Sequence, residues 1–254
     1  MKNLTLHIPH ASTEIPLKEG YLVDQSKIDE EILKLTDWYT DDLFAFKEAI
    51  TVKAEFSRIF CDTERFSDDS KEVMAKVGMG VIYEKCDDGT PLRKVSTSLR
   101  NRILQKYYWA HHDLLKKAVE QQLKAHNKAF IIDCHSFPDV PLKRSLNKEN
   151  CRPDFNIGTD SYHTPEELLL LSKRFFEERG YTVGIDWPFS GSMVPLKYYK
   201  KDKRVVSIML EVNRKNYLED NGNIKSANYL KTKKVIQDFL RSLNENINFK
   251  NTQR

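Results

Sequence analysis

The sequence predicts an α/β protein of three layers, α/β/α, with a mixed, largely parallel central sheet. Three short apolar runs, rich in β-branched residues, stop abruptly at a histidine or a glutamate. Between them lie segments in which apolar residues recur at helical spacing. Strands that alternate with helices in this way form open sheets covered on both faces, and ligands bind beyond the carboxyl ends of the parallel strands.

The first half of the chain begins with a strand within residues 4–10. Apolar residues then recur at helical spacing over 26–35 and again over 38–46, which predicts two helices. Short β-branched or apolar segments near 51–54 and 57–61 predict two further strands.

The longest helical pattern covers residues 98–125. Its predicted buried stripe consists of Leu99, Ile103, Tyr107, Ala110, Leu114, Leu115, Ala118 and Leu123. A strand over 130–136 follows directly. Thr164 is the expected N-cap of the next helix, which Gly180 closes. Strands over 181–185 and 205–212 and a helix over 227–243 complete the pattern.

Length and composition are those of one large domain spanning residues 1–254. The chain is 40% hydrophobic, and no Pro/Gly/Ser-rich linker divides it. Its 41 basic and 37 acidic residues nearly balance, which argues against a nucleic-acid partner. No apolar stretch is long enough for a signal peptide or a membrane span, so we expect a cytoplasmic protein without a membrane partner.

The four cysteines are irregularly spaced, which predicts free thiols rather than a disulfide framework. Cys61 and Cys134 fall in apparent core strands. Because neighbouring side chains of a strand point to opposite faces, Cys134 should face the packing if His135 faces the cleft.

Two histidines and one glutamate lie where the predicted parallel strands end: His10, His135 and Glu211. Neutral imidazoles and a carboxylate are ligands that zinc prefers, and a further carboxylate can take a proton from water. Glu211 emerges from an apolar strand, so its pKa should be raised into the range of a general base and acid, unless it only pairs with Arg214. A histidine of this kind taken alone is more often a hydrogen-bonded structural residue than a metal ligand.

Five short blocks occur in the order seen in the N-formylglutamate amidohydrolase family, which the sequence therefore resembles. The blocks are Pro9-His10-Ala11-Ser12, Ser57-Arg58-Ile59-Phe60-Cys61-Asp62-Thr63-Glu64-Arg65-Phe66, Asp133-Cys134-His135-Ser136, Trp187-Pro188-Phe189-Ser190-Gly191 and Leu210-Glu211-Val212-Asn213-Arg214. The resemblance implies a phosphorylase/hydrolase-like fold, related to zinc carboxypeptidases and aspartoacylases. It also implies cleavage of an amide with the help of Zn²⁺ or another divalent metal.

The resemblance makes His10 and His135 the expected metal ligands. Asp37 is the favoured third ligand, because it is similar to an aspartate characteristic of the family. Glu14 is the alternative, since it follows His10 at a spacing one residue longer than the carboxypeptidase His-x-x-Glu. The proton-transferring carboxylate is again Glu211.

Arginines recognise carboxylates through their planar fork, and Arg58, Arg65 and Arg214 match arginines of the family pattern. We expect them to hold the carboxylates of the substrate. Ser192 and Asn213 are further candidates for contact with the substrate, and His112 and Asp41 are expected to support the site from behind.

The expected activity is that of a metal-dependent amidohydrolase that removes an acyl group, formyl in the family, from an acidic amino acid such as glutamate. The substrate partner is then a small N-acyl amino acid. Thr63-Glu64 departs from the neutral pair common in the family, so a divergent substrate stays open. The alternatives are a zinc carboxypeptidase or amidase acting on a peptide or cell-wall fragment, and a non-catalytic binding module on the same fold.

Overall fold

A six-stranded sheet forms the centre of the computed structural model, which describes residues 3–220 and 222–251; the ends of the predicted domain 1–254 lie outside the described residues. The strand order is β2-β1-β3-β6-β4-β5, and every neighbouring pair is parallel except β4 and β6. The strands are β1 Leu4–Ile8, β2 Ala49–Lys53, β3 Ala129–Phe137, β4 Phe155–Gly158, β5 Val183–Ile185 and β6 Val205–Asn213. The predicted mixed, largely parallel α/β sheet is confirmed.

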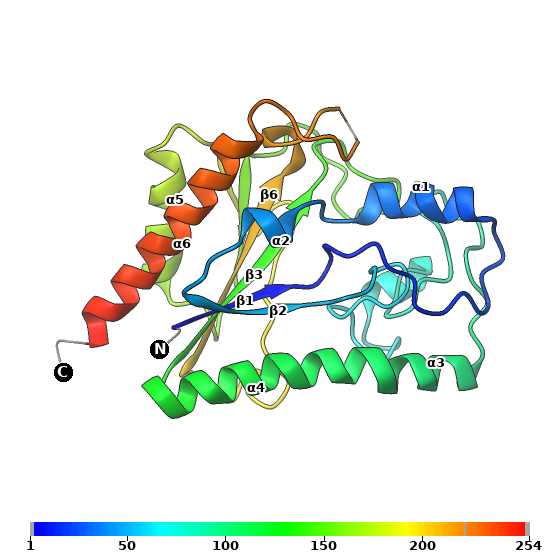
Figure 1. Ribbon diagram of the computed structural model, residues 1–254, viewed down its shortest axis with the longest axis horizontal. Helices are drawn as coiled ribbons and strands as arrows, with labels where there is room; N and C mark the ends of the chain where they lie inside the picture. The colour runs from blue at the N-terminus through cyan, green and yellow to red at the C-terminus, as the bar shows by residue number, and fades with distance from the viewer. Residues whose placement is uncertain (1–2, 221, 252–254) are drawn as a thin grey trace.

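Helices cover both faces of this sheet, as Figure 1 shows. One face carries α5 (Glu166–Glu177), α6 (Tyr229–Asn251) and the short α2 (Thr40–Leu43), while α4 (Trp109–His126) covers the other. The chain beyond the sheet contains α1 (Gln25–Leu35) and α3 (Thr97–Ile103). No helix in the described part of the chain is both long and apolar enough to cross a membrane.

The two faces of the central strands differ in chemistry because side chains alternate along each strand. Leu6, Ile132 and Leu210 face the main apolar core, which they share with aromatic residues of α5 and α6. Cys134 lies in this same core, which confirms that it points away from the cleft. The opposite face carries His135 and the polar groups described below. All four cysteines are free, as predicted, and Cys151 alone among them is exposed.

Three local predictions were wrong. Residues 57–61 form a turn rather than a strand, because the backbone N–H groups of Phe60 and Cys61 donate to the carbonyl of Ser57. Thr164 does not cap α5, because its hydroxyl donates to the carbonyl of Ser207 in β6. The helical pattern over 38–46 yields only the four residues of α2.

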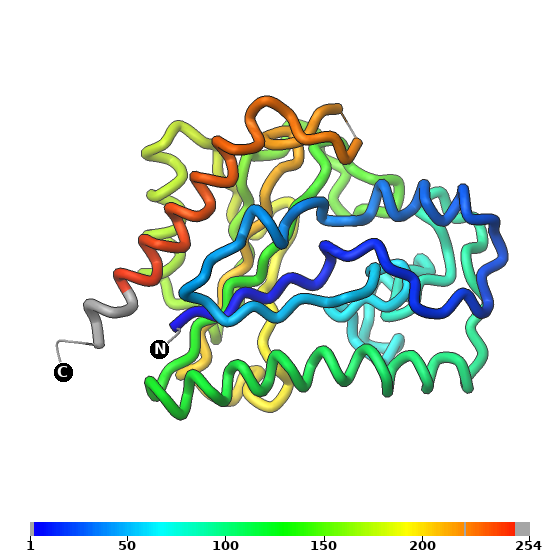
Figure 2. Tube along the Cα trace, viewed as in Figure 1, coloured from blue at the N-terminus to red at the C-terminus, as the bar shows by residue number. Residues whose placement is uncertain are grey.

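The helix predicted over 98–125 runs without a gap, but the set of positions that faces the sheet changes within it. A π-turn over Leu104–Tyr108 joins α3 to α4, and the N–H of Trp109 donates to the carbonyl of Leu104. A π-turn holds one extra residue and so changes which positions after it face the sheet. The predicted Ala110 and Leu114 are therefore exposed and His111 is buried, whereas Leu115 and Ala118 are buried as predicted. Figure 2 shows the helix running along the whole length of the molecule.

Candidate active site

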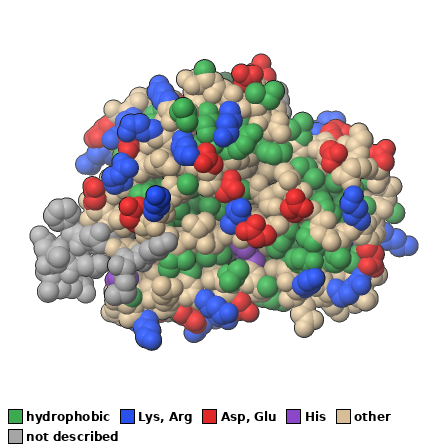
Figure 3. Space-filling model, in the orientation of Figure 1, with side chains coloured by type: hydrophobic (Ala, Val, Ile, Leu, Met, Phe, Trp, Pro, Cys, Tyr) green, Lys and Arg blue, Asp and Glu red, His purple; other side chains and the backbone are tan. Residues whose placement is uncertain are grey.

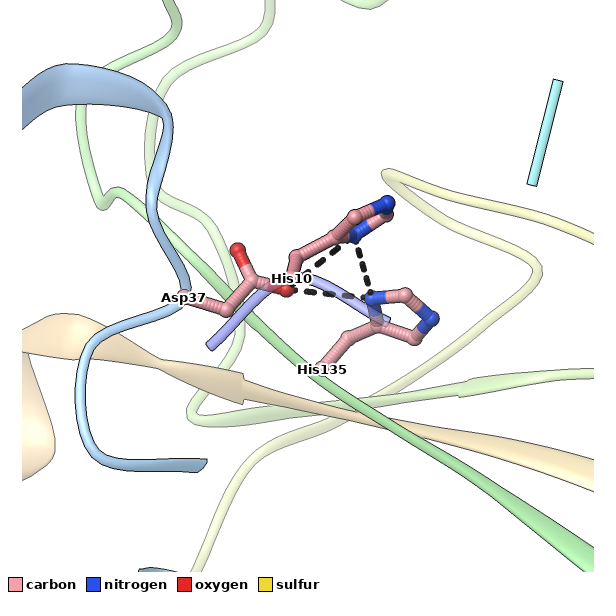
Figure 4. A group of neighbouring side chains, drawn as sticks. All are labelled: His10, Asp37 and His135. Carbon is pink, nitrogen blue, oxygen red and sulfur yellow. Dashed lines mark hydrogen bonds and ion pairs between the residues drawn. The ribbon is translucent and has the colours of Figure 1, made fainter. Parts of the chain in front are cut away.

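Three donor atoms converge at the carboxyl ends of β1 and β3, as Figure 4 shows. His10 Nδ1 lies 3.3 Å from His135 Nδ1, and Asp37 Oδ2 lies 3.6 and 3.0 Å from these two nitrogens. Asp37 follows α1, and its backbone N–H donates to the carbonyl of His10. A tetrahedral ion with bonds of about 2.0–2.1 Å has ligand atoms about 3.3–3.4 Å apart, so the spacing fits a zinc-sized cation.

Hydrogen bonds on the far side of each imidazole determine which nitrogen faces the cluster. His10 Nε2 lies 2.8 Å from Asp62 Oδ1. His135 Nε2 lies 3.1 Å from Glu64 Oε2 and 3.2 Å from Asp133 Oδ1. Because carboxylates only accept, both Nε2 atoms carry hydrogen, and a neutral imidazole then offers its Nδ1 lone pair to a cation.

Neighbouring carboxylates raise the pKa of both imidazoles in this cluster. Burial lowers the pKa of His135, but the carboxylates of Glu64 and Asp133 raise it by more, so that the net pKa is well above its usual range. Burial and Arg58 lower the pKa of His10, yet its carboxylate partners leave it raised. A bound cation would displace these protons, because ligating imidazoles must be neutral.

A second layer of buried polar groups extends from His135 to α4. His7 Nδ1 lies 2.7 Å from Asp133 Oδ1, and His7 Nε2 lies 2.8 Å from His111 Nε2. Burial lowers the pKa of His111 to about 2, so this imidazole is neutral. The chain His111–His7–Asp133–His135 therefore links α4, β1 and β3 behind the cluster and fixes the orientation of His135.

Glu211 stands beside His135 on the neighbouring strand, since the two residues are register partners of β6 and β3. Its side chain is 6% exposed, and burial raises its pKa to about 7. Within the part of the chain that the structure describes, its Oε2 has no hydrogen-bond partner. A carboxyl group with such a pKa and a free oxygen is suited to exchange protons near neutral pH.

Two arginines flank Asp37 in the same cavity. Arg214 Nη2 lies 3.1 Å from Asp37 Oδ1, and Arg58 Nη1 lies 4.0 Å from the same oxygen. Arg58 also donates through Nε and Nη2 to Asp62 Oδ2, at 3.2 and 3.0 Å. The positive charge of both guanidinium groups is therefore held at the wall of the cavity.

The cavity that contains these groups has a volume of about 390 Å³. It is lined by His10, Asp37, His135, Glu211 and three predicted arginines, Arg58, Arg65 and Arg214.

On the face drawn in Figure 3, acidic and basic side chains are interspersed and histidine is visible near the centre. That face carries no single-sign field of the kind that nucleic-acid binding uses.

Other predicted residues lie away from the cluster. Glu14 is exposed and lines a separate surface pocket. Asp41, expected behind the site, lies exposed in α2 and pairs with Lys53 at 3.4 Å. Asn213 is buried and holds loops together, because its amide donates to Asp139 Oδ1 and to the carbonyl of Pro153.

His112 and Ser192 are also absent from the lining of the cavity that contains the His10–Asp37–His135 cluster. Both line an adjoining cavity of about 300 Å³, which meets the first at Glu64 and Arg65. Of the predicted substrate-contacting residues, Arg58 and Arg214 line the first cavity, Ser192 lines the second, and Arg65 lines both.

Sequence reasoning missed the supporting residues Asp62, Asp133 and His111. Asp133 precedes His135 by two residues and so shares its strand face, a signal that alternation alone provides. Asp62 belongs to one of the five family blocks, but no local pattern around it indicates that it binds His10. His111 was hidden by the π-turn, which no periodicity predicts.

The fold and the cavity with its imidazole and carboxylate groups define a candidate hydrolase of the α/β class. A family model described as N-formylglutamate amidohydrolase matches residues 3–218. The chain belongs to the N-formylglutamate amidohydrolase family. No curated protein sequence matches the chain significantly.

Two solved structures are similar in fold. The N-formylglutamate amidohydrolase of Ralstonia eutropha JMP134 has a TM-score of 0.84 at 22% identity, with 97% of this chain and 94% of that chain covered. A gene product of Agrobacterium tumefaciens has a TM-score of 0.66 at 15% identity, with 95% and 92% covered.

Proposed function

We propose that the protein is a metal-dependent amidohydrolase that cleaves the N-acyl amide of an acidic amino acid, with N-formylglutamate as the reference substrate. The observation that carries the proposal is the convergence of His10 Nδ1, His135 Nδ1 and Asp37 Oδ2 at tetrahedral spacing. Family membership supports the reaction class.

His10, His135 and Asp37 would hold the ion, with zinc favoured by two imidazoles and one carboxylate. When bound there, the ion supplies a Lewis acid that polarises the amide carbonyl and lowers the pKa of water. Asp62 on His10, and Glu64 with Asp133 on His135, keep both Nδ1 atoms directed at the centre.

Glu211 then acts as general base and general acid. Its carboxylate accepts a proton from the attacking water, and the same proton passes to the amide nitrogen as the carbon–nitrogen bond breaks, which releases the acid and the amine. A pKa raised to about 7 by burial suits both transfers.

Arg58 and Arg214 are the proposed partners of the substrate carboxylates. Both guanidinium groups line the cavity beside Asp37 and are only slightly exposed. Their acidic partners hold them in place, so a substrate carboxylate meets preorganised donors.

The retained His10, Asp37, His135 and Glu211 argue against a binding module without turnover. A peptide or cell-wall amidase would use the same chemistry on a larger substrate, and the same assay separates it from the proposed function. We propose a cytoplasmic reaction, which the free thiols support.

The test is release of glutamate from N-formyl-L-glutamate by protein reconstituted with Zn²⁺, beside protein treated with a chelator. We expect turnover that is lost with the chelator and restored by Zn²⁺. N-formyl-leucine serves as the neutral comparison and should have the lower kcat/KM. Turnover of acylated peptides but of neither formyl amino acid would favour the amidase alternative, and turnover unaffected by complete metal removal would refute the metal-dependent mechanism.

A further inference from the structure

We call the cavity that contains the His10–Asp37–His135 cluster the catalytic cavity; the cavity that adjoins it is a second space with its own polar groups. We call it the side chamber; it has a volume of about 300 Å³ and shares Glu64, Arg65, Ser190 and Met209 with the catalytic cavity. Asp133 and Met209 line it, two residues before His135 and Glu211 on the same strands. Two residues of a strand span about 6.5 Å, so a chain of a few atoms reaches the chamber from the proposed reaction centre.

Three buried polar atoms at the side chamber have no hydrogen-bond partner among the described residues. They are Arg65 Nε, His112 Nε2 and Ser192 Oγ. Arg65 Nε forms an ion pair with Asp62 Oδ2 at 3.6 Å, which is beyond hydrogen-bond distance. A buried polar atom without a hydrogen bond destabilises the fold, so the three together indicate a place for a hydrogen-bonding guest. Burial lowers the pKa of His112 to about 4, so its imidazole is neutral.

The wall of the side chamber is held in place by hydrogen bonds. The backbone N–H of Met193 donates to Asp133 Oδ2 at 2.9 Å, and Ser207 Oγ donates to the carbonyl of Met193 at 2.8 Å. The loop that carries Ser192 is thereby tied to β3 and β6. The chamber is consequently part of the rigid scaffold rather than a gap beside a free loop.

Charge and size define what the side chamber accepts. The carboxylates of Glu64 and Asp133 and the guanidinium group of Arg65 border it, whereas Arg58 and Arg214 line the catalytic cavity only. An anionic group therefore suits the catalytic cavity better, and a neutral group suits the chamber. A water molecule has a share of about 30 Å³ in the liquid, so the chamber is far larger than a formyl group needs.

We propose that the side chamber is an acyl subsite for neutral, hydrogen-bonding acyl groups of several non-hydrogen atoms, larger than formyl. This inference rests on the proposed function, because it places the scissile amide at the His10–Asp37–His135 cluster and the amino-acid carboxylates at Arg58 and Arg214. Arg65 Nε and Ser192 Oγ donate to a carbonyl of the acyl group, and His112 Nε2 accepts from its amide or hydroxyl.

The test compares N-acyl-L-glutamates with matched acyl groups. N-(3-carbamoylpropanoyl)-glutamate carries a neutral amide, N-(4-methylpentanoyl)-glutamate is its apolar isostere, and N-succinyl-glutamate is its anionic isostere; N-formyl-glutamate is the reference. Dissociation constants are measured by calorimetry on the zinc-loaded Glu211→Gln protein, and kcat/KM on the zinc-loaded unmodified protein. We expect the neutral amide to bind at least tenfold more tightly than the formyl compound, and the anion to bind most weakly of the three isosteres.

Two variants and one control variant separate the effect of chamber size from that of polarity. Leu196→Trp fills the chamber and should lower the preference for the neutral amide over formyl at least tenfold, whereas Leu170→Trp, at an equally exposed leucine of α5, should leave that preference unchanged. Ser192→Ala should reduce the advantage of the neutral amide over its apolar isostere by about two- to tenfold.

The outcomes distinguish this inference from the proposed function. Affinity that falls steadily with acyl length, or a preference that Leu196→Trp does not change, would overturn the acyl subsite even if N-formyl-glutamate is hydrolysed. The expected order of binding without turnover of any of the four compounds would retain the subsite and refute the proposed hydrolysis.

Discussion

Replacing Glu211 with glutamine should strongly lower turnover and also make the metal-free protein more stable above neutral pH. The carboxyl group is buried beside His135, and burial raises its pKa from 4.5 to about 7. Because the folded chain holds this proton more tightly than the unfolded chain, stability is lost as the pH rises from about 4.5 to about 7. Glutamine cannot ionise, so the variant avoids this loss.

The size of this stability change follows from the pKa shift of Glu211. One pKa unit corresponds to about 1.4 kcal/mol, so the ionised carboxylate costs the folded protein about 3 kcal/mol at pH 8. The free energy of unfolding of Glu211→Gln, relative to that of the unmodified protein, should therefore rise by about that amount between pH 4.5 and pH 8. In the zinc-loaded protein the gain should shrink, because a neighbouring cation favours the ionised form.

The assay is urea unfolding of both proteins at the two pH values, with a chelator present. Glu14→Gln, at an exposed side chain, is the matched control and should show no such gain. In the zinc-loaded protein kcat should fall about 10²- to 10⁴-fold in Glu211→Gln, with the metal content kept. Equal stability changes at both pH values would refute the buried-carboxylate argument, and near-normal kcat would remove Glu211 from the mechanism.

Three further predictions concern the metal. The purified protein should hold one divalent ion per chain by elemental analysis, and the double variant His10→Ala/His135→Ala should hold none; unchanged content would refute the ligand assignment. Asp37→Ala should weaken zinc affinity in a chelator competition more than Glu14→Ala does, and the reverse order would make Glu14 the third ligand. Asp133→Asn should weaken zinc affinity about 10- to 100-fold, because the buried histidine chain loses the negative charge that orients His7 and His135; an unchanged affinity would make the buried histidine chain irrelevant to the metal.

Sequence patterns predicted the sheet well, because buried parallel strands leave a strong signal in β-branched runs that end at polar residues. They also predicted that Cys134 and His135 point to opposite faces, since alternation is a local property of a strand. The failures lie where the fold, and not the local composition, decides. Residues 57–61 have a strand-like composition, but a turn uses their hydrogen bonds, and only the fold determines that choice.

The candidate site was predictable where a residue ends a strand and unpredictable where a loop or a helix phase positions it. His10, His135 and Glu211 follow from strand ends. Asp37 was selected by resemblance alone, since nothing local indicates that the backbone after α1 bonds to the carbonyl of His10. Ser192 was expected to contact the substrate, but its place in the sequence does not indicate which of two adjoining cavities its loop borders.

The π-turn between α3 and α4 sets the rotational phase of the helix that carries His111. One residue of an α-helix corresponds to a rotation of about 100°, and the π-turn absorbs this rotation by holding one residue more than an α-turn. If the same residues formed a continuous α-helix, His111 would leave the sheet and the exposed Ala110 and Leu114 would face it. The extra residue of the π-turn therefore brings the imidazole of His111 to His7.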